Sequence, residues 1–71
     1  MKSYTWHKLY GIDVAVDDET GKIHHAIASG LTCYPYAPAP KKYGGGYENV
    51  CGCYTLKQAR GMIKRRTLLF F

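Results

Sequence analysis

The sequence is short of negative charge and of long apolar runs, and each shortage excludes a class of protein. Its 71 residues hold five Asp and Glu against ten Lys and Arg, which gives a formal net charge of +5. No segment approaches the roughly 20 consecutive apolar residues that a membrane-spanning helix needs. The first residues, MKSYTWHKLYG, also lack the apolar core of a signal peptide. We therefore expect a cytoplasmic protein that does not contact a membrane.

Cysteine is the next shortage, with three residues at positions 33, 51 and 53. An odd number does not suit the disulfide framework of a small secreted domain, so we expect reduced thiols. The pair CGC leaves one residue between its thiols, whereas paired zinc ligands usually have roughly two to four. A zinc-stabilised module built on His25, Cys33, Cys51 and Cys53 stays as an alternative, and we predict no cofactor. His24 is expected to point to the opposite face of the strand from His25.

The sequence also lacks a recognisable reaction centre. A hydrophobic core of this size rarely supplies more than ~3–5 kcal/mol, which leaves no room for a deep enclosed pocket. The stretch KKYGGGY has no Lys-Ser/Thr ending of a phosphate-binding loop, and the acidic residues at 17–19 lie in a predicted turn. A Cys33–His25 pair would need a third, orienting group that the sequence does not place. We therefore predict that the protein is not an enzyme.

The charge that is present is unevenly distributed. Residues 1–35 sum to −1, whereas residues 36–71 hold seven Lys and Arg against Glu48 alone and sum to +6. Such a field favours anionic partners through electrostatic attraction that salt screens. The same charge also keeps a small domain soluble, which is the simpler interpretation.

Two alternating segments predict a β-hairpin over residues 12–29. In IDVAVDD, apolar Ile and Val alternate with Asp13, Ala15 and Asp17, which we expect to face outward. DDETGK supplies turn residues, and KIHHAIAS alternates again. The preceding SYTWHKLY predicts a further extended segment that ends at a bend at Gly11.

Residues 30–50 break this pattern with three prolines and three glycines. Proline lacks the backbone donor that a central strand needs and breaks helices, so we expect neither element here. Residues 34–47 are instead predicted to be a flexible Pro/Gly/Tyr-rich insertion, with at most a short edge strand near residues 32–36. The final TLLFF is a further candidate strand, apolar on both faces, and its exposed face leaves a homodimer as an alternative.

The segment YTLKQARGMIKRR predicts an amphipathic helix with Thr55 as its N-cap. Leu56, Ala59, Met62 and Ile63 share its apolar arc, next to a row of basic residues. Together these elements predict an α+β fold: one domain over residues 1–71, with a small antiparallel sheet of three to five strands and one helix packed on one face.

Basic and aromatic side chains in the second half are the candidate contact surface, because stacking rings beside cations suit nucleic acids and other anions. The candidates for partner or nucleic-acid binding are Lys41, Lys42, Tyr43, Tyr47, Lys57, Arg60, Lys64, Arg65 and Arg66.

The order of YGIDVAVDDETGKIHHAIA and YTLKQARGMI resembles a loose class of short phage and mobile-element proteins that includes several anti-CRISPR inhibitors. The resemblance covers about half of the chain. It implies a non-enzymatic inhibitor in the host cytoplasm that occludes a host protein or ribonucleoprotein complex, with guide RNA, DNA or an acidic protein patch as the contact. A small basic DNA- or RNA-binding protein is the alternative. The matching residues are Tyr54, Thr55, Leu56, Ala59, Arg60 and Ile63.

Overall fold

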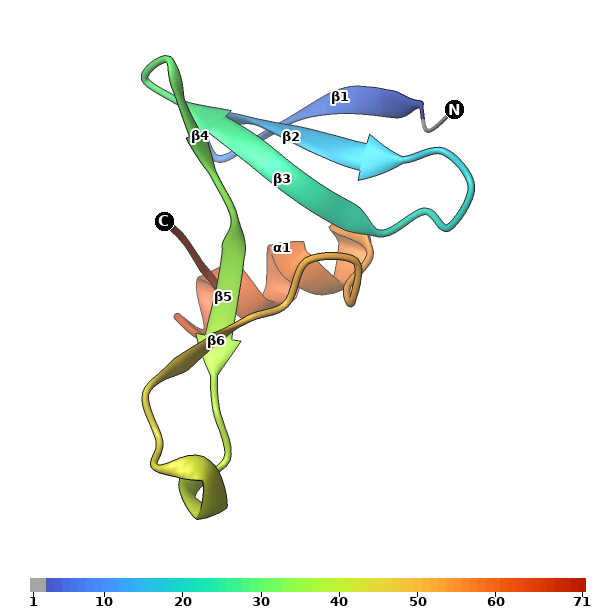
Figure 1. The fold of residues 1–71 in the computed structure, drawn as a ribbon. Helices are drawn as coiled ribbons and strands as arrows, with labels where there is room; N and C mark the ends of the chain where they lie inside the picture. The colour runs from blue at the N-terminus through green and yellow to red at the C-terminus, as the bar shows by residue number, and fades with distance from the viewer. Residues whose placement is uncertain (1–2) are drawn as a thin grey trace.

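The fold is α+β, with one α-helix and two antiparallel sheets in the residues that the structure describes (Figure 1). This computed structural model describes residues 3–71, apart from the side chain of Tyr43. The predicted class is confirmed, but the prediction of a single sheet is wrong. The four-stranded sheet has the order β1 (Tyr4–Leu9), β2 (Ile12–Asp17), β3 (Ile23–Ala28) and β4 (Leu31–Cys33). The second sheet has the order β6 (Tyr47–Asn49), β5 (Pro35–Pro38) and β7 (Leu69–Phe70); the remaining elements are the 3₁₀ turn η1 (Lys41–Tyr43) and α1 (Leu56–Lys64).

The four-stranded sheet is an antiparallel meander with tight turns. Its first and last turns have two central residues each, Tyr10-Gly11 and Ser29-Gly30, all with positive φ. This is the type I′ geometry, whose twist matches that of the flanking strands. The hairpin predicted over residues 12–29 is confirmed as the β2–β3 pair.

Of the three outward positions predicted on β2, Asp13 is exposed as predicted, whereas Ala15 and Asp17 are buried. Ala15 does face the outer side of the sheet, but the rings of Trp6 and His25 flank it, with 5.4 Å between their centroids, and it is 0% exposed. Asp17 is 6% exposed, and its Oδ1 accepts a hydrogen bond from the Glu19 N–H at 2.8 Å within the turn. The alternation of apolar and polar residues therefore predicts which face of the sheet a residue lies on. Whether the residue is exposed depends on the side chains next to it.

Two strands of the second sheet, β5 and β6, lie in the segment that was predicted to hold no central strand, and that prediction is wrong. β5 is the central strand, between β6 and β7. Its two prolines stand at its ends, so the residues without an N–H flank the paired interior residues Tyr36 and Ala37. The Pro35 carbonyl still accepts a hydrogen bond from the Val50 N–H at 2.8 Å.

One extended segment connects the two sheets. β4 ends at Cys33 and β5 begins at Pro35, so only Tyr34 lies between them (Figure 1). The Tyr34 N–H donates to the Phe71 carbonyl at 2.7 Å, and the Phe71 N–H donates to the Tyr34 carbonyl at 3.0 Å. The end of β7 is therefore tied to the point where the chain crosses from one sheet to the other.

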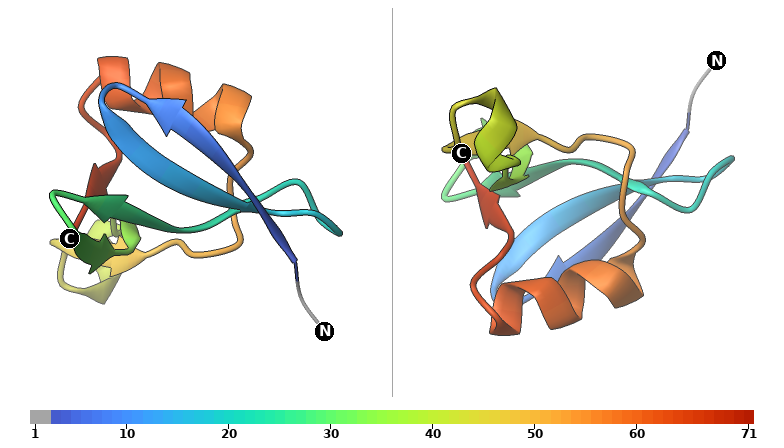
Figure 2. Two further views of the ribbon diagram at one scale, coloured as in Figure 1. Left: turned by 90° about the horizontal axis from the view of Figure 1, so that it is seen from above. Right: turned by 90° about the horizontal axis from the view of Figure 1, so that it is seen from below.

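The core is built from apolar residues of both sheets and of α1, which lie around a common centre (Figure 2). The C-terminal segment alternates as predicted, since Leu69 and Phe71 are 38% and 64% exposed while their neighbour Leu68 is buried. The buried members of the core are Leu9, Val14, Val16, Ile23, Ala26, Ala37, Val50, Ala59 and Leu68.

Helix α1 begins at the predicted N-cap, Thr55, which forms a capping box with Gln58. The Thr55 Oγ1 accepts from the Gln58 N–H at 3.3 Å, and the Thr55 N–H donates to the Gln58 Oε1 at 3.0 Å. The helix ends in a Schellman turn, in which the Thr67 N–H donates to the Met62 carbonyl at 2.8 Å and Arg66 takes a φ of 59°. No helix in the described part of the chain is long and apolar enough to cross a membrane.

Candidate anion-binding surface

Helix α1 carries a dense group of positive side chains on its exposed side. Lys57, Arg60 and Lys64 recur at intervals of three and four residues, so they form one row along the helix, here named the basic helix row. Arg65 and Arg66 follow at its C-terminal end, and all five residues are exposed. The helix that carries the predicted row is therefore present, and its basic side chains are exposed.

The apolar arc of the same helix explains why the basic helix row faces water. Ala59 is fully buried, and Leu56, Met62 and Ile63 pack against the core, as predicted. Burial of this arc fixes the rotation of the helix about its axis. The exposed side is held further by the Tyr10 hydroxyl, which donates to a carbonyl of the row, that of Arg60, at 3.5 Å.

Among the residues that the structure describes, no carboxylate forms an ion pair with the basic helix row. The ion pair between the Lys8 Nζ and the Asp13 Oδ1, at 3.0 Å, lies on the four-stranded sheet and not on the helix. The first turn of α1 has no acidic residue, and the last turn carries Lys64, where a cation also suits the helix dipole. The charge of the row is therefore available to an anionic partner.

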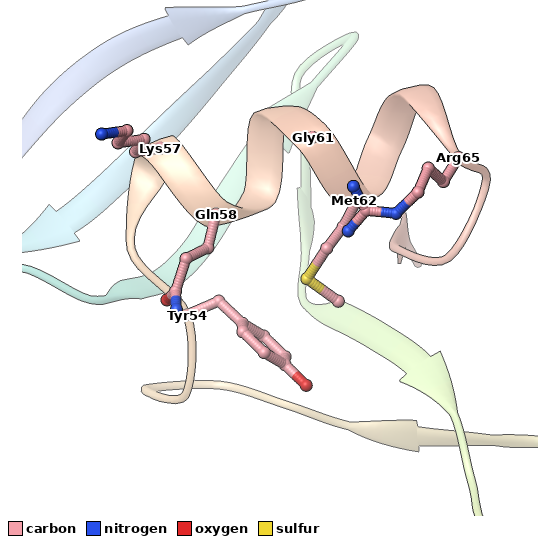
Figure 3. Close-up of a pocket in the computed structure, with 6 residues that line it drawn as sticks. All are labelled: Tyr54, Lys57, Gln58, Gly61, Met62 and Arg65. Atoms are coloured by element: carbon pink, nitrogen blue, oxygen red, sulfur yellow. The ribbon is translucent and has the colours of Figure 1, made fainter.

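An open pocket of about 440 Å³ lies beside α1. Figure 3 shows the Tyr54 ring and the Met62 thioether projecting to the same side of the helix, whereas the Lys57 ammonium points away from them. The pocket thus offers an aromatic ring and a thioether next to the Arg65 guanidinium, an arrangement that suits a flat group carried by an anion. The residues that line it are Tyr54, Lys57, Gln58, Gly61, Met62 and Arg65.

Gly61 gives the Arg65 side chain room to lie along the helix. A Cβ at Gly61 would stand 3.3 Å from an Arg65 Nη atom. Figure 3 shows the guanidinium folded back beside Met62 rather than extended into solvent. Glycine in a helix costs about 1 kcal/mol relative to alanine, and at this position it accommodates a cation at the rim of the pocket.

The tongue, defined as residues 41–47, lies in another part of the molecule. Its Lys41 and Lys42 are exposed in η1, and Tyr47 of β6 is 49% exposed. Figures 1 and 2 show the tip of this hairpin projecting from the three-stranded sheet, away from α1. The candidate side chain of Tyr43 lies outside the described residues. The structure therefore does not bring the tongue and the basic helix row into one surface.

The four zinc candidates do not come together either. Among the described residues, no three His, Cys, Asp or Glu side chains form a group that could hold a metal ion. Cys33 pairs with the buried Ala26, on the inner side of the sheet, whereas His25 pairs with Ala15 on the outer side. The other two cysteines, at positions 51 and 53, lie in the turn after β6. Because side chains alternate along strands, the candidate zinc ligands His25 and Cys33 lie on opposite sides of the sheet.

His24 and His25 share one face of the sheet, and the prediction that they point apart is wrong. The β2–β3 register shifts between Ala15, which pairs with His25, and Val16, which pairs with Ile23. His24 is therefore the extra residue of a β-bulge, which re-aims side chains in the bulged strand. The Nδ1 atoms of the two imidazoles lie 3.0 Å apart.

Three more rings surround this pair on the outer face. The centroid of the Tyr4 ring lies 5.2 Å from that of His24 and 5.3 Å from that of His25. The Trp6 centroid lies 5.4 Å from that of His25. The Tyr34 centroid lies 6.4 Å from that of His24 and 6.3 Å from that of His25. Burial lowers the pKa of His25 from its usual 6.5, and the nearby His24 lowers it further. The only sign of this cluster in the sequence is that Tyr4 and Trp6 alternate on one face of the first segment.

No family model matches the chain, and no curated protein and no solved structure shows significant similarity to it. The function proposed for the protein accordingly depends on its own surfaces and their chemistry.

Proposed function

We propose that this protein is a non-enzymatic binding protein that uses the basic helix row to dock onto an anionic surface of a host nucleic-acid-handling complex. The observation that carries the proposal is the gathering of five exposed cations at one helix, with no carboxylate partner within residues 3–71. Occlusion of that surface would inhibit the complex. This is the activity that the resemblance to anti-CRISPR proteins of phages and mobile elements implies.

The helix is a suitable mount for such a contact because its position is fixed at several points. The capping box fixes its start, Ala59 anchors its apolar side, and the Tyr10 hydroxyl bonds to the Arg60 carbonyl. Cations on a fixed element lose less conformational freedom on binding than cations on a loose segment. Beside the row, the pocket would receive an aromatic or other flat group of the partner.

Direct binding of DNA or RNA is the second candidate function. It is favoured by the Tyr54 ring in a pocket that Lys57 and Arg65 also line. Proteins that bind single strands without sequence preference combine a positive groove with rings on which bases stack. In this version the helix cations contact phosphates and Tyr54 stacks on a base.

Binding to fluorescent single-stranded DNA and RNA oligonucleotides, measured by anisotropy over a range of salt concentrations, separates the two candidates. Nucleic-acid binding predicts an affinity that falls steeply as salt rises, because phosphate contacts release counterions. An inhibitor of a protein complex predicts little oligonucleotide binding. It predicts instead a loss of target-DNA binding by a purified RNA-guided effector complex when this protein is added.

A pair of matched variants tests the surface in either assay. Lys57→Ala/Lys64→Ala and Lys41→Ala/Lys42→Ala each remove two positive charges, the first from the basic helix row and the second from the tongue. We expect the helix variant to lose binding or inhibition and the tongue variant to retain most of it. The reverse result would transfer the contact to the tongue, and equal losses would mean that net charge alone drives binding.

A further inference from the structure

We propose that His24 and His25 form a two-imidazole binding site for a divalent transition metal ion of the nickel–copper type. This site lies on the outer face of the four-stranded sheet and is independent of the basic helix row. It depends on the β-bulge, which gives two consecutive residues of β3 one common face.

The distance between the two nitrogens is compatible with two neighbouring ligands of one ion. Imidazole nitrogens bind divalent ions of this size at roughly 2.0–2.1 Å. Two nitrogens 3.0 Å apart then subtend an angle of about 90–97° at the ion, if its bonds have these lengths. That is the angle between neighbouring ligands in square-planar or octahedral geometry. A tetrahedral zinc ion would need the nitrogens about 3.3–3.4 Å apart. Nitrogen ligands in a square-planar or tetragonal arrangement are typical of Cu(II) and Ni(II).

The surrounding rings hold the two imidazoles next to each other before any ion arrives. The His24 and His25 rings are perpendicular to each other, with an interplanar angle of 90°. Tyr4 packs against both of them, and Trp6 packs edge-on against His25. A preorganised ligand pair loses less freedom when it binds.

Metal binding would replace the hydrogen bond between the two imidazoles, and both rings would stay neutral. In the neutral pair, one Nδ1–H donates to the other Nδ1. On binding, the donor ring moves its proton to Nε2 through solvent, so both Nδ1 lone pairs face the ion. Water fills the other coordination positions. Trp6 is 50% exposed, so the site opens to solvent at this side.

Ni(II) alone is the probe, because it does not oxidise the three thiols of the chain. Titration of the wild-type protein by calorimetry should show one ion per chain, and saturation should quench the single tryptophan, Trp6, because its ring lies 5.4 Å from that of His25. His24→Asn/His25→Asn should lower the Ni(II) affinity by at least about tenfold and abolish the quenching. The control is His7→Asn, which removes the third histidine of the chain, an exposed one, and should change neither result.

Two results would overturn the site. One is an unchanged Ni(II) affinity in the folded double variant, which would place the ion on the cysteines or elsewhere. The other needs no variant: if the wild-type protein binds no Ni(II), or binds it without any change in Trp6 emission, the histidine pair is a hydrogen bond only. Circular dichroism of the double variant, with the single His24→Asn variant as a milder substitute, shows whether the fold is kept.

Discussion

Thr55 and Gln58 satisfy each other's backbone donors at the start of α1: the Thr55 hydroxyl accepts from the Gln58 N–H, and the Gln58 side chain accepts from the Thr55 N–H. Each bond pairs a donor that the first turn of a helix would otherwise leave free. This reciprocal pair determines where the basic helix row begins.

Thr55→Ala should lower the free energy of unfolding by about 0.5–2 kcal/mol, because one helix donor loses its acceptor. Urea denaturation of the wild-type and variant proteins measures the difference. Gln58→Ala removes the other half of the box. Because the two bonds support each other, the double variant should lose less than the sum of the single losses. Fully additive losses would show that the two bonds act independently.

Arg66→Gly should raise the free energy of unfolding by about 0.5–1 kcal/mol. Arg66 takes a left-handed φ of 59° in the turn that closes α1, a conformation that glycine adopts without steric cost. The gain is partly offset by the greater freedom of glycine in the unfolded chain. The control is Arg65→Gly, since Arg65 has a φ of −86° and nothing to gain from glycine. Equal effects of the two variants on the denaturation midpoint would contradict this explanation.

Leu68→Ala should destabilise the protein by about 2–5 kcal/mol, because Leu68 is 2% exposed and the cavity would open in the shared core. Leu31→Ala is the matched control, since Leu31 is 70% exposed on β4 and its truncation should change stability by no more than about 0.5 kcal/mol. Thermal or urea unfolding compares the two. A small effect at Leu68 would mean that β7 and the segment before it contribute little to the core.

The stability of the metal-free protein should fall as the pH drops below about 6.5. The pKa of His25 is lower in the folded protein than its unfolded value of 6.5, so the unfolded chain binds the proton more tightly. Its contribution is fully present above pH 6.5 and is lost as the pH falls through that value toward the folded pKa. Urea titrations in chelator over this range measure the slope. His25→Asn should flatten it, and His7→Asn should leave it unchanged; a slope that survives in His25→Asn must come from another group.

Local patterns were sufficient for the β2–β3 hairpin and for α1. In both cases the information lies within a few residues: alternation on either side of the DDETGK turn, and a capping residue in front of an apolar arc. The burial of Ala59 and the exposure of Lys57, Arg60 and Lys64 follow from the same arc. These features do not depend on distant parts of the chain.

The second sheet and the histidine pair were not predictable in this way. β5 pairs with Leu69 and Phe70, more than thirty positions away in the chain, and sequence pattern alone does not specify that pairing. The bulge depends on which residue of β3 is left out of the pairing with β2. Because residues 24 and 25 are both histidines, the sequence pattern does not show which of them is left out. For the candidate surface, the charges were visible in the sequence, but the separation of the tongue from α1 arises from the second sheet.

Because Tyr34 alone links β4 to β5 and also bonds to Phe71, a partner that pulls on the tongue pulls directly on the strand next to the histidines. A link of one residue leaves little chain between β4 and β5 to absorb that displacement. A displacement of the tongue should therefore move the strands that carry the histidine pair. The fluorescence of Trp6, which lies beside the pair, should change with it.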